Sequence, residues 1–338
     1  MKKLAIIGGG LSGLYAAYTL QNKYEITIFE SRDRLGGRIH TIEGFDMGPS
    51  WIWSHQDRIL SLIQSLKIEL FPQYTRGYAL YDTPQGVQRF TPPPSPPSAR
   101  MKGGLMTMID ALASSLNPES IRLSEPVQSI YTQNNTMVLE TAQGDYTADL
   151  VLCTLPPRIA LETITYNPPL PASLTQQLSA IPTWMGHTAK CVIEFKTPFW
   201  REMGLSGFCF SHTGPLGEIH DACTDDRPAL FGFVHSGALM DTIEKDVRSQ
   251  MHRLFGEAGK EIVSIHLVDW KQERFSSAPD DAQGLRSHPT YGISASCFDN
   301  RLLFIGTETA FTEGGYLEGA IRSVEQIHNL LSCNDSSF

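Results

Sequence analysis

Residues 4–30 read LAIIGGGLSGLYAAYTLQNKYEITIFE, and this stretch decides the fold. The apolar run at 4–7 predicts a short buried strand, and residues 11–21 predict a helix that begins on glycines. A second strand is expected at 25–29, with Glu30 at its carboxyl end. Two strands joined by a helix within about 30 residues form a βαβ unit, in which the two strands are parallel.

The glycines between the first strand and the helix predict a nucleotide site. Gly8, Gly10 and Gly13 form the pattern G-x-G-x-x-G, which permits a tight turn, close approach of a pyrophosphate and close packing of helix on strand. The free N–H groups and positive dipole end of the helix then face the phosphates. Glu30 is placed to accept hydrogen bonds from ribose hydroxyls. This pattern does not choose between NAD and FAD.

The loop that follows favours a dinucleotide with a second contact region. Residues 30–41 (ESRDRLGGRIHT) carry Arg32 and Arg38 around the glycine pair 36–37. Two phosphates need charge compensation along their length, and this cationic loop supplies it. A solvated, charged turn would account for Arg34 but not for the paired glycines.

The rest of the chain predicts an open α/β domain interrupted by a second, strand-rich domain. Residues 91–98 (TPPPSPPS) are expected to form an extended polyproline connection at the surface. The remaining expected elements are helices at 59–66, 106–116 and 240–255 and strands at 121–130, 137–141, 149–155, 190–195, 231–235 and 262–269.

Composition excludes several classes of protein. The 338 residues contain 27 Lys and Arg against 36 Asp and Glu, a balance that argues against binding a nucleic-acid backbone. The six cysteines form no CxxC pair, and no HExxH occurs, so we expect reduced thiols, a cytoplasmic location and no metal site. No run of 18 apolar residues exists, and the short N-terminal run ends on glycines, so neither a membrane anchor nor a secretory signal is expected.

Five motifs together give this chain a definite resemblance. It is similar to the flavin-containing amine oxidase family, and most of all to its monoamine oxidases, in family order from residue 4 to about 326. The motifs are GGGLSGLYAA (8–17), ESRDRLGGRIHT (30–41), VLCTLPP (151–157), MGHTAKCVIEFKTPFW (185–200) and FIGTETA with GGYLEGA (304–310 and 314–320).

The resemblance implies an α/β fold in two domains. A Rossmann-like FAD-binding domain is expected at 1–75, 100–178 and 275–338. A smaller mixed α+β substrate domain at 76–99 and 179–274 interrupts it. Between Tyr74 and Gly103 the chain is much shorter than such oxidases usually are, so part of the helical layer of the substrate domain should be missing.

The resemblance also assigns contacts with FAD. Glu308 would lie at the ribityl and phosphate region, and the helix that begins near Gly315 would direct its N-terminus at the flavin pyrimidine. The residues matched to FAD contacts are Gly8, Gly10, Ser12, Gly13, Glu30, Arg32, Gly37, Arg38, Val127, Glu308, Gly315 and Leu317.

Three residues are candidates for catalysis. On the residues alone, Lys190 and Glu194 share one face of a strand and would form a solvated pair. The resemblance instead matches Lys190 to the lysine that holds a water against flavin N5. It matches Tyr316 to one wall of the aromatic cage around the substrate amine, and Trp270 to a tryptophan near the flavin.

The segment Ala278-Pro279-Asp280 departs from the family pattern. Pro279 stands where members with covalent flavin carry their linking cysteine, so FAD should be bound non-covalently. Asp280 stands where the second aromatic wall of the cage is expected. We therefore expect a cage that is open on one side or is rebuilt from elsewhere. If Asp280 faces the flavin across from Tyr316, it would favour substrates that carry a second amino group.

The resemblance predicts an FAD-dependent oxidase of amines. A hydride equivalent would pass from the amine α-carbon to flavin N5, and O₂ would be reduced to H₂O₂. The expected partners are thus a small amine and O₂, with no nucleic acid. Two alternatives stay open, a flavin-dependent desaturase or dehydrogenase with another acceptor, and a flavin-binding protein with little turnover.

Overall fold

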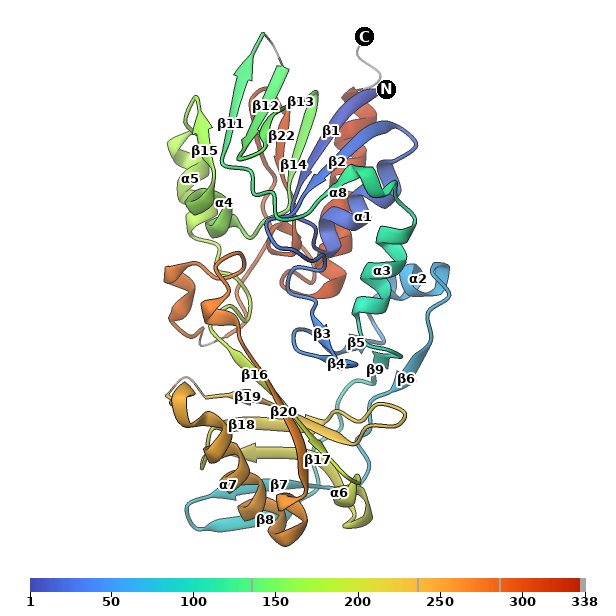
Figure 1. Ribbon diagram of the computed structural model, residues 1–338, viewed down its shortest axis with the longest axis vertical. Helices are drawn as coiled ribbons and strands as arrows, with labels where there is room; N and C mark the ends of the chain where they lie inside the picture. Colours follow the sequence, from blue (N-terminus) through green and yellow to red (C-terminus); the bar gives the residue numbers. More distant parts are fainter. Residues whose placement is uncertain (135, 236, 286, 335–338) are drawn as a thin grey trace.

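The computed structural model describes residues 1–134, 136–235, 237–285 and 287–334. The chain forms an elongated molecule in two parts, with the N-terminus and the last described turn of the C-terminal helix at the end away from the seven-stranded sheet (Figure 1). Segments from the beginning, middle and end of the sequence build the part that carries the termini. The other part is built around that seven-stranded sheet.

A six-stranded sheet forms the centre of the first part. Five of its strands run parallel, and the sixth pairs antiparallel with its neighbour at one edge. The order is β10 (Ile121–Arg122), β2 (Tyr24–Phe29), β1 (Lys2–Ile7), β14 (Leu150–Cys153), β22 (Leu302–Phe304) and β21 (Ala295–Cys297).

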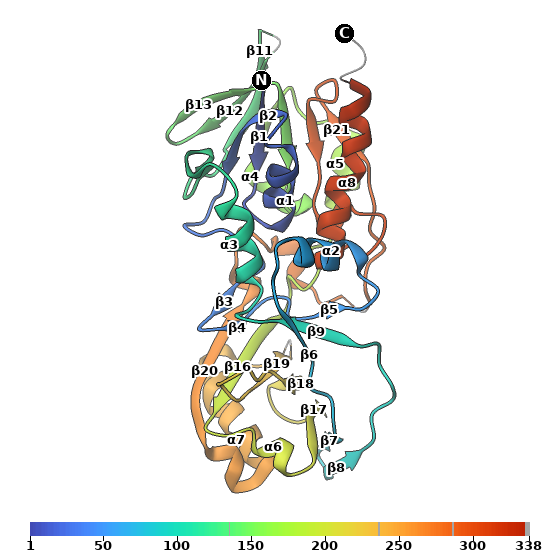
Figure 2. The same ribbon diagram turned by 90° about the vertical axis from the view of Figure 1, so that its right-hand side faces the viewer.

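Two different layers cover the faces of this sheet, as Figure 2 shows. Helices pack on one face through an apolar core, and a small four-stranded sheet with two helices packs on the other. The first layer contains α1 (Leu11–Leu20), α2 (Asp57–Ser65), α3 (Met106–Ser114) and α8 (Leu317–Asn334). The second contains β13 (Gly144–Ala148), β12 (Thr136–Thr141), β11 (Ser129–Gln133), β15 (Thr165–Asn167), α4 (Pro157–Thr163) and α5 (Ala172–Ser179). This architecture confirms the expected α/β class.

The seven-stranded sheet has one face on its own core and one face toward the first part. Helix α7 (Ile243–Phe255) and the short α6 (Phe199–Glu202) pack on the core face. The strand order is β20 (Ile262–Asp269), β16 (Ala189–Phe195), β19 (Ala229–Val234), β18 (Leu216–Asp221), β17 (Leu205–Ser211), β7 (Tyr78–Thr83) and β8 (Gly86–Phe90).

Short strands connect the two parts. The ribbon β3 (Thr41–Ile42) and β4 (Phe45–Asp46) places Phe45 and Met47 against Val192 and Phe231 of the larger sheet. A three-stranded sheet lies beside it, with β9 (Ser98–Met101) between β5 (Ile52–Trp53) and β6 (Leu70–Pro72).

Most expected elements are present, and one is wrong. The strand expected at 121–130 is two strands in different sheets, because Ser124 has a left-handed backbone and Pro126 has no N–H to donate. The sequence interpretation also missed β7, β8, β17 and β18. All seven strands of the larger sheet fall inside the expected segments 76–99 and 179–274; the domain boundaries themselves stay a prediction.

The glycines of the first turn have separable roles, which a pair of variants should reveal. A Cβ at Gly13 would lie 2.0 Å from the carbonyl oxygen of Gly8, whereas the nearest atom to a Cβ at Gly10 is 3.9 Å away. Gly13→Ala should therefore lower the free energy of unfolding by about 1–3 kcal/mol through overpacking. Gly10→Ala, the matched control, should leave the stability of the FAD-free protein close to that of the wild type. Chemical denaturation measures both, and equal stabilities of the two variants would contradict this assignment.

Candidate active site

A cavity of about 1020 Å³ extends between the two parts of the molecule. At one end it reaches the glycine turn that precedes α1, and at the other it reaches the face of the seven-stranded sheet that points toward the first part. Twelve of the fifteen predicted site residues line it, among them Gly8, Gly10, Ser12, Glu30, Arg32, Gly37, Arg38, Lys190, Trp270 and Tyr316. Gly315 and Leu317 also line it, whereas Gly13, Val127 and Glu308 do not.

The glycine end of the cavity has free donors and an acid. Helix α1 begins after Gly10 with no side-chain cap and no acidic residue in its first turn, so its first N–H groups face the cavity without a protein anion. Glu30 is 3% exposed and accepts hydrogen bonds from the backbone N–H of Gly9 (2.7 Å) and Arg32 (2.8 Å). Its carboxylate is thereby fixed at the end of β2.

An ion pair holds the second cationic loop. The guanidinium of Arg38 donates to both carboxylate oxygens of Glu308, at 2.5 and 2.9 Å. Glu308 is 1% exposed and lies outside the cavity wall, so it acts on the cavity through Arg38. Arg32 is paired with Glu273 at 3.0 Å.

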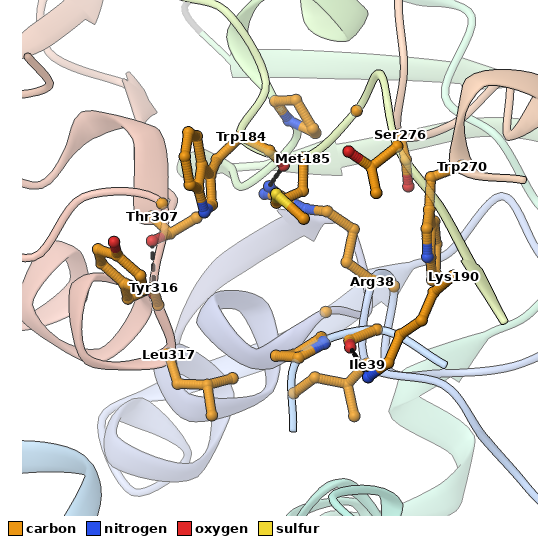
Figure 3. A pocket seen from close by; sticks show the side chains of 18 of the residues that line it. Arg38, Ile39, Trp184, Met185, Lys190, Trp270, Ser276, Thr307, Tyr316 and Leu317 are labelled. Carbon is orange, nitrogen blue, oxygen red and sulfur yellow. Dashed lines mark hydrogen bonds between the residues drawn. The ribbon is translucent and has the colours of Figure 1, made fainter. Parts of the chain in front are cut away.

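The middle of the cavity contains Lys190 and Trp270, which Figure 3 shows pointing from the same side. Lys190 is 2% exposed; its Nζ donates to the carbonyl oxygen of Gly48 (2.9 Å) and to Ser50 Oγ (2.6 Å). It also lies 4.1 Å from the centre of the Phe231 ring. Trp270 donates its indole N–H to the carbonyl oxygen of Met47 at 3.0 Å.

The solvated pair of Lys190 and Glu194 is therefore wrong. Both side chains do share a face, but this face is buried against the first part of the molecule. Glu194 pairs instead with Arg227, at 2.7 Å. Burial lowers the pKa of Lys190 to about 7, an effect that the charge of Asp46 opposes.

Aromatic rings gather on the opposite wall. Trp184 and Tyr316 line the cavity with ring centres 6.4 Å apart (Figure 3). Outside the wall, His288 stacks parallel on Tyr316 at 5.0 Å. Neither Trp184 nor His288 was predicted from the sequence, because no family motif includes them.

The expectation that Asp280 faces Tyr316 is wrong. Asp280 is exposed and does not line the cavity. In the turn that begins at Pro279, the neighbouring Asp281 is the buried acid; it accepts from Arg158 (2.6 Å) and from the backbone N–H of Thr183 (2.9 Å). These bonds hold the turn so that Asp280 points to solvent.

The residues of the cavity fit a dinucleotide. Around Gly10 no atom lies closer than 3.9 Å to the place of a Cβ, beside the uncapped helix N-terminus and next to the fixed acid of Glu30. The cavity continues from there past Arg38 to Lys190, which gives an elongated cofactor a single continuous site. Within the described residues, no group of three or more His, Cys, Asp or Glu side chains is arranged to hold a metal ion.

Comparison with known proteins establishes the class of protein. The family model for flavin containing amine oxidoreductases matches residues 11–101 and 95–325. The chain therefore belongs to this family, and FAD is its cofactor. The two matched segments meet at residues 95–101, inside the stretch expected to be shortened.

Individual relatives have low sequence identity to this chain, but their alignments cover nearly all of it. An L-amino acid dehydrogenase of Synechocystis is 24% identical over 445 positions, covering 95% of this chain and 92% of the relative. The flavin-containing amine oxidase B of Bos taurus is 22% identical and covers 96% of this chain and 84% of the relative. Since these alignments are longer than the chain of 338 residues, more than a hundred positions lie opposite gaps.

A solved structure shows the same fold. A putrescine oxidase, bound to putrescine, superposes with a TM-score of 0.82 at 19% identity and covers 98% of this chain and 99% of its own. No helix in the described part of this chain is long and apolar enough to cross a membrane. Among the cysteines whose side chains the structure describes, four are buried free thiols and Cys297 is a half-buried free thiol. Cys333 is not among these described side chains.

The buried Lys190 predicts a pH-dependent stability. Its pKa is about 7 in the folded protein and near 10.5 when exposed, so the unfolded chain binds one more proton between these values. The contribution of Lys190 to stability should therefore rise with pH, by up to about 1.4 kcal/mol per pH unit, and should level off below about pH 7. We expect the free energy of unfolding of the wild type minus that of Lys190→Met to increase from about pH 7 to about pH 9. A difference that does not change with pH would mean that Lys190 stays charged in the fold.

Proposed function

We propose that this protein is an FAD-dependent oxidase of amines that lack an α-carboxylate. The observation that carries this proposal is that Lys190 and Trp270 line the same cavity as the glycine turn before α1, where the residues fit a dinucleotide. When bound, FAD would supply the acceptor for a hydride equivalent from the amine α-carbon, with O₂ as the final oxidant that is reduced to H₂O₂.

Lys190 would position water in this reaction. When protonated, its Nζ has three N–H donors, of which two point to Gly48 and Ser50. We propose that the third N–H donates to a water in the cavity. A pKa of about 7 lets Nζ accept or release a proton near neutral pH, which suits hydrolysis of an imine product or delivery of a proton to reduced oxygen.

The aromatic wall would receive the amine. Tyr316 and Trp184 present apolar rings to the cavity, and such rings exclude water and favour the neutral form of an amine. Tyr316 is 37% exposed, and its backbone oxygen accepts from Thr307 Oγ1 at 2.6 Å, which fixes the turn before α8.

The charges of the cavity favour an amine over an amino acid. Arg38 and Arg32 are already paired with Glu308 and Glu273, so neither guanidinium is available to bind a substrate carboxylate. Toward the aromatic wall and the sheet, the cavity presents the acids Glu313 and Glu218. An α-carboxylate would be repelled there.

A dehydrogenase that uses another electron acceptor is the second candidate function. The similarity to the Synechocystis L-amino acid dehydrogenase favours it. An aerobic screen of amines and amino acids for H₂O₂ separates the two: peroxide from amines supports the oxidase. Anaerobic bleaching of the flavin followed by slow reoxidation supports the dehydrogenase, and no bleaching by any amine or amino acid would contradict both. A cytoplasmic location is part of the proposal.

FAD should be released by denaturation. Pro279, which stands at the position of the linking cysteine in covalent members, has no thiol, and it lies exposed in its turn. Acid precipitation of the purified yellow protein should leave the flavin absorbance in the supernatant. Absorbance that stays with the pellet would show a covalent bond elsewhere.

Lys190→Met should slow the oxidative half-reaction. Methionine keeps much of the volume of the stem but has no ammonium to hold water. We expect reoxidation of the reduced variant by O₂ to be about 10-fold or more slower in stopped-flow measurements, with FAD still bound. Lys196→Met is the matched control, because Lys196 is an exposed lysine of the same strand region that pairs with Glu261. Wild-type rates in both half-reactions of Lys190→Met would remove Lys190 from the mechanism.

A further inference from the structure

The seven-stranded sheet carries a row of side chains that begins at Lys190 and leads away from the glycine turn where the cofactor is expected to bind. Lys190 lies opposite Phe233 on β19, which lies opposite Glu218 on β18. Glu218 in turn lies opposite Phe210 on β17, which lies opposite Tyr81 on β7. The first four of these residues line the cavity, and Phe210 and Tyr81 are 42% and 38% exposed.

A β-bulge directs Glu218 into this row. The pairing of β18 with β19 shifts between Leu216 and Glu218, with Gly217 as the extra residue. Leu216 and Ile219 both belong to the buried core on the other face, although a regular strand would place residues three apart on opposite faces. The bulge therefore moves Glu218 from the core face to the cavity face. A side chain at Gly217 would collide with the ring of His235, at 2.5 Å.

One oxygen of Glu218 is available to a ligand. Oε1 lies 2.6 Å from His220 Nε2, and within the described residues Oε2 has no hydrogen-bond partner. The interaction with His220 lowers the pKa of Glu218, so the carboxylate is ionised near neutral pH. His220 itself is held between the rings of Phe208 and Phe231, at 5.0 and 5.3 Å.

The other carboxylates of the cavity wall are already engaged. Both oxygens of Glu30 accept backbone N–H groups. In Glu313, Oε1 lies 3.5 Å from His55 and Oε2 accepts from Gln56 at 3.0 Å. Among the described residues that line the cavity, Glu218 is thus the carboxylate with a free oxygen. Phe233 and Phe210 flank it on both sides in the row, so the charge at this place of the row is that of Glu218.

We propose that Glu218 binds a second, remote ammonium group of the substrate, so that the preferred substrate class is an alkyl diamine extended along the row from Lys190. This proposal rests on the proposed amine oxidation. One end of the diamine is oxidised in the space between Lys190 and the opposite aromatic wall of Trp184 and Tyr316, which favours its neutral form. The other end stays charged between Phe233 and Phe210 and donates to Glu218 Oε2.

The sheet geometry sets the length of the substrate. Lys190 and Glu218 are two strands apart, so their backbone positions are separated by about 10 Å. A diamine therefore needs several carbons between its nitrogens to reach both places. Ethylenediamine is too short, and hexamethylenediamine is long enough. Because the row continues to the exposed Phe210 and Tyr81, longer chains would extend along it toward solvent.

The test compares hexamethylenediamine with hexylamine as reductants of the flavin in the holoenzyme. We expect the ratio of kcat/KM for the diamine to that for the monoamine to fall roughly tenfold to hundredfold in Glu218→Gln, because a neutral amide replaces the charged acceptor. Glu313→Gln, the matched control at the other cavity acid, should change this ratio less than threefold. Flavin content and thermal unfolding confirm that each variant is folded.

Reversing the charge at position 218 should increase the activity on a different substrate, and a misfolded variant would not show such an increase. Glu218→Lys should oxidise aminocaproate, whose remote group is a carboxylate, faster than the wild type does. An unchanged ratio in Glu218→Gln, or a loss of the ratio in Glu313→Gln alone, would overturn the role of Glu218 while amine oxidation stands. Failure of every amine to reduce the wild-type flavin would overturn the proposed function itself.

Discussion

The ion pair between Arg38 and Glu308 is the interaction on which the rest of the site depends. It joins the loop after the first βαβ unit to the turn before the last helix, residues that are 270 positions apart in the sequence. A charged pair with two parallel hydrogen bonds fixes both orientation and distance. Because Arg38 also contacts the carbonyl oxygen of Trp184 at 3.5 Å, the same contact positions the aromatic wall relative to the cofactor cradle. The cavity is thus assembled from three distant segments that meet at one guanidinium.

The first turn and the buried lysine could be predicted for different reasons. The structure of residues 4–30 could be predicted from the local pattern, since the strand, the glycine turn and the helix follow one another in the sequence. Glu30 comes directly after the last residue of β2. Lys190 could be found only by resemblance, because its strand pattern alone equally fits an exposed face. Its Nζ donates to Gly48 and Ser50, which come from a part of the chain about 140 residues earlier, and no local pattern records those contacts.

The errors lie where backbone geometry overrides the pattern of side chains. The family motif placed Asp280 in the cavity, but the hydrogen bonds of Asp281 with Arg158 and Thr183 set the turn and direct Asp280 outward. Strands β17 and β18 were missed because glycines at 207 and 217 interrupt their alternation, and a glycine in a strand is also a sign of a bulge. That sign was the available signal for Glu218.

The bulge at Gly217 has a consequence for how the chemistry of this cavity diverges among related chains. A single inserted or deleted residue in β18 exchanges the side chains of its two faces, so an acid enters or leaves the cavity without any codon for that acid being altered. Related chains with the same residues and different strand lengths would then differ in the charge of their cavities. Alignments scored by substitutions alone would overlook that difference, whereas the count of residues between Leu216 and Ile219 would reveal it.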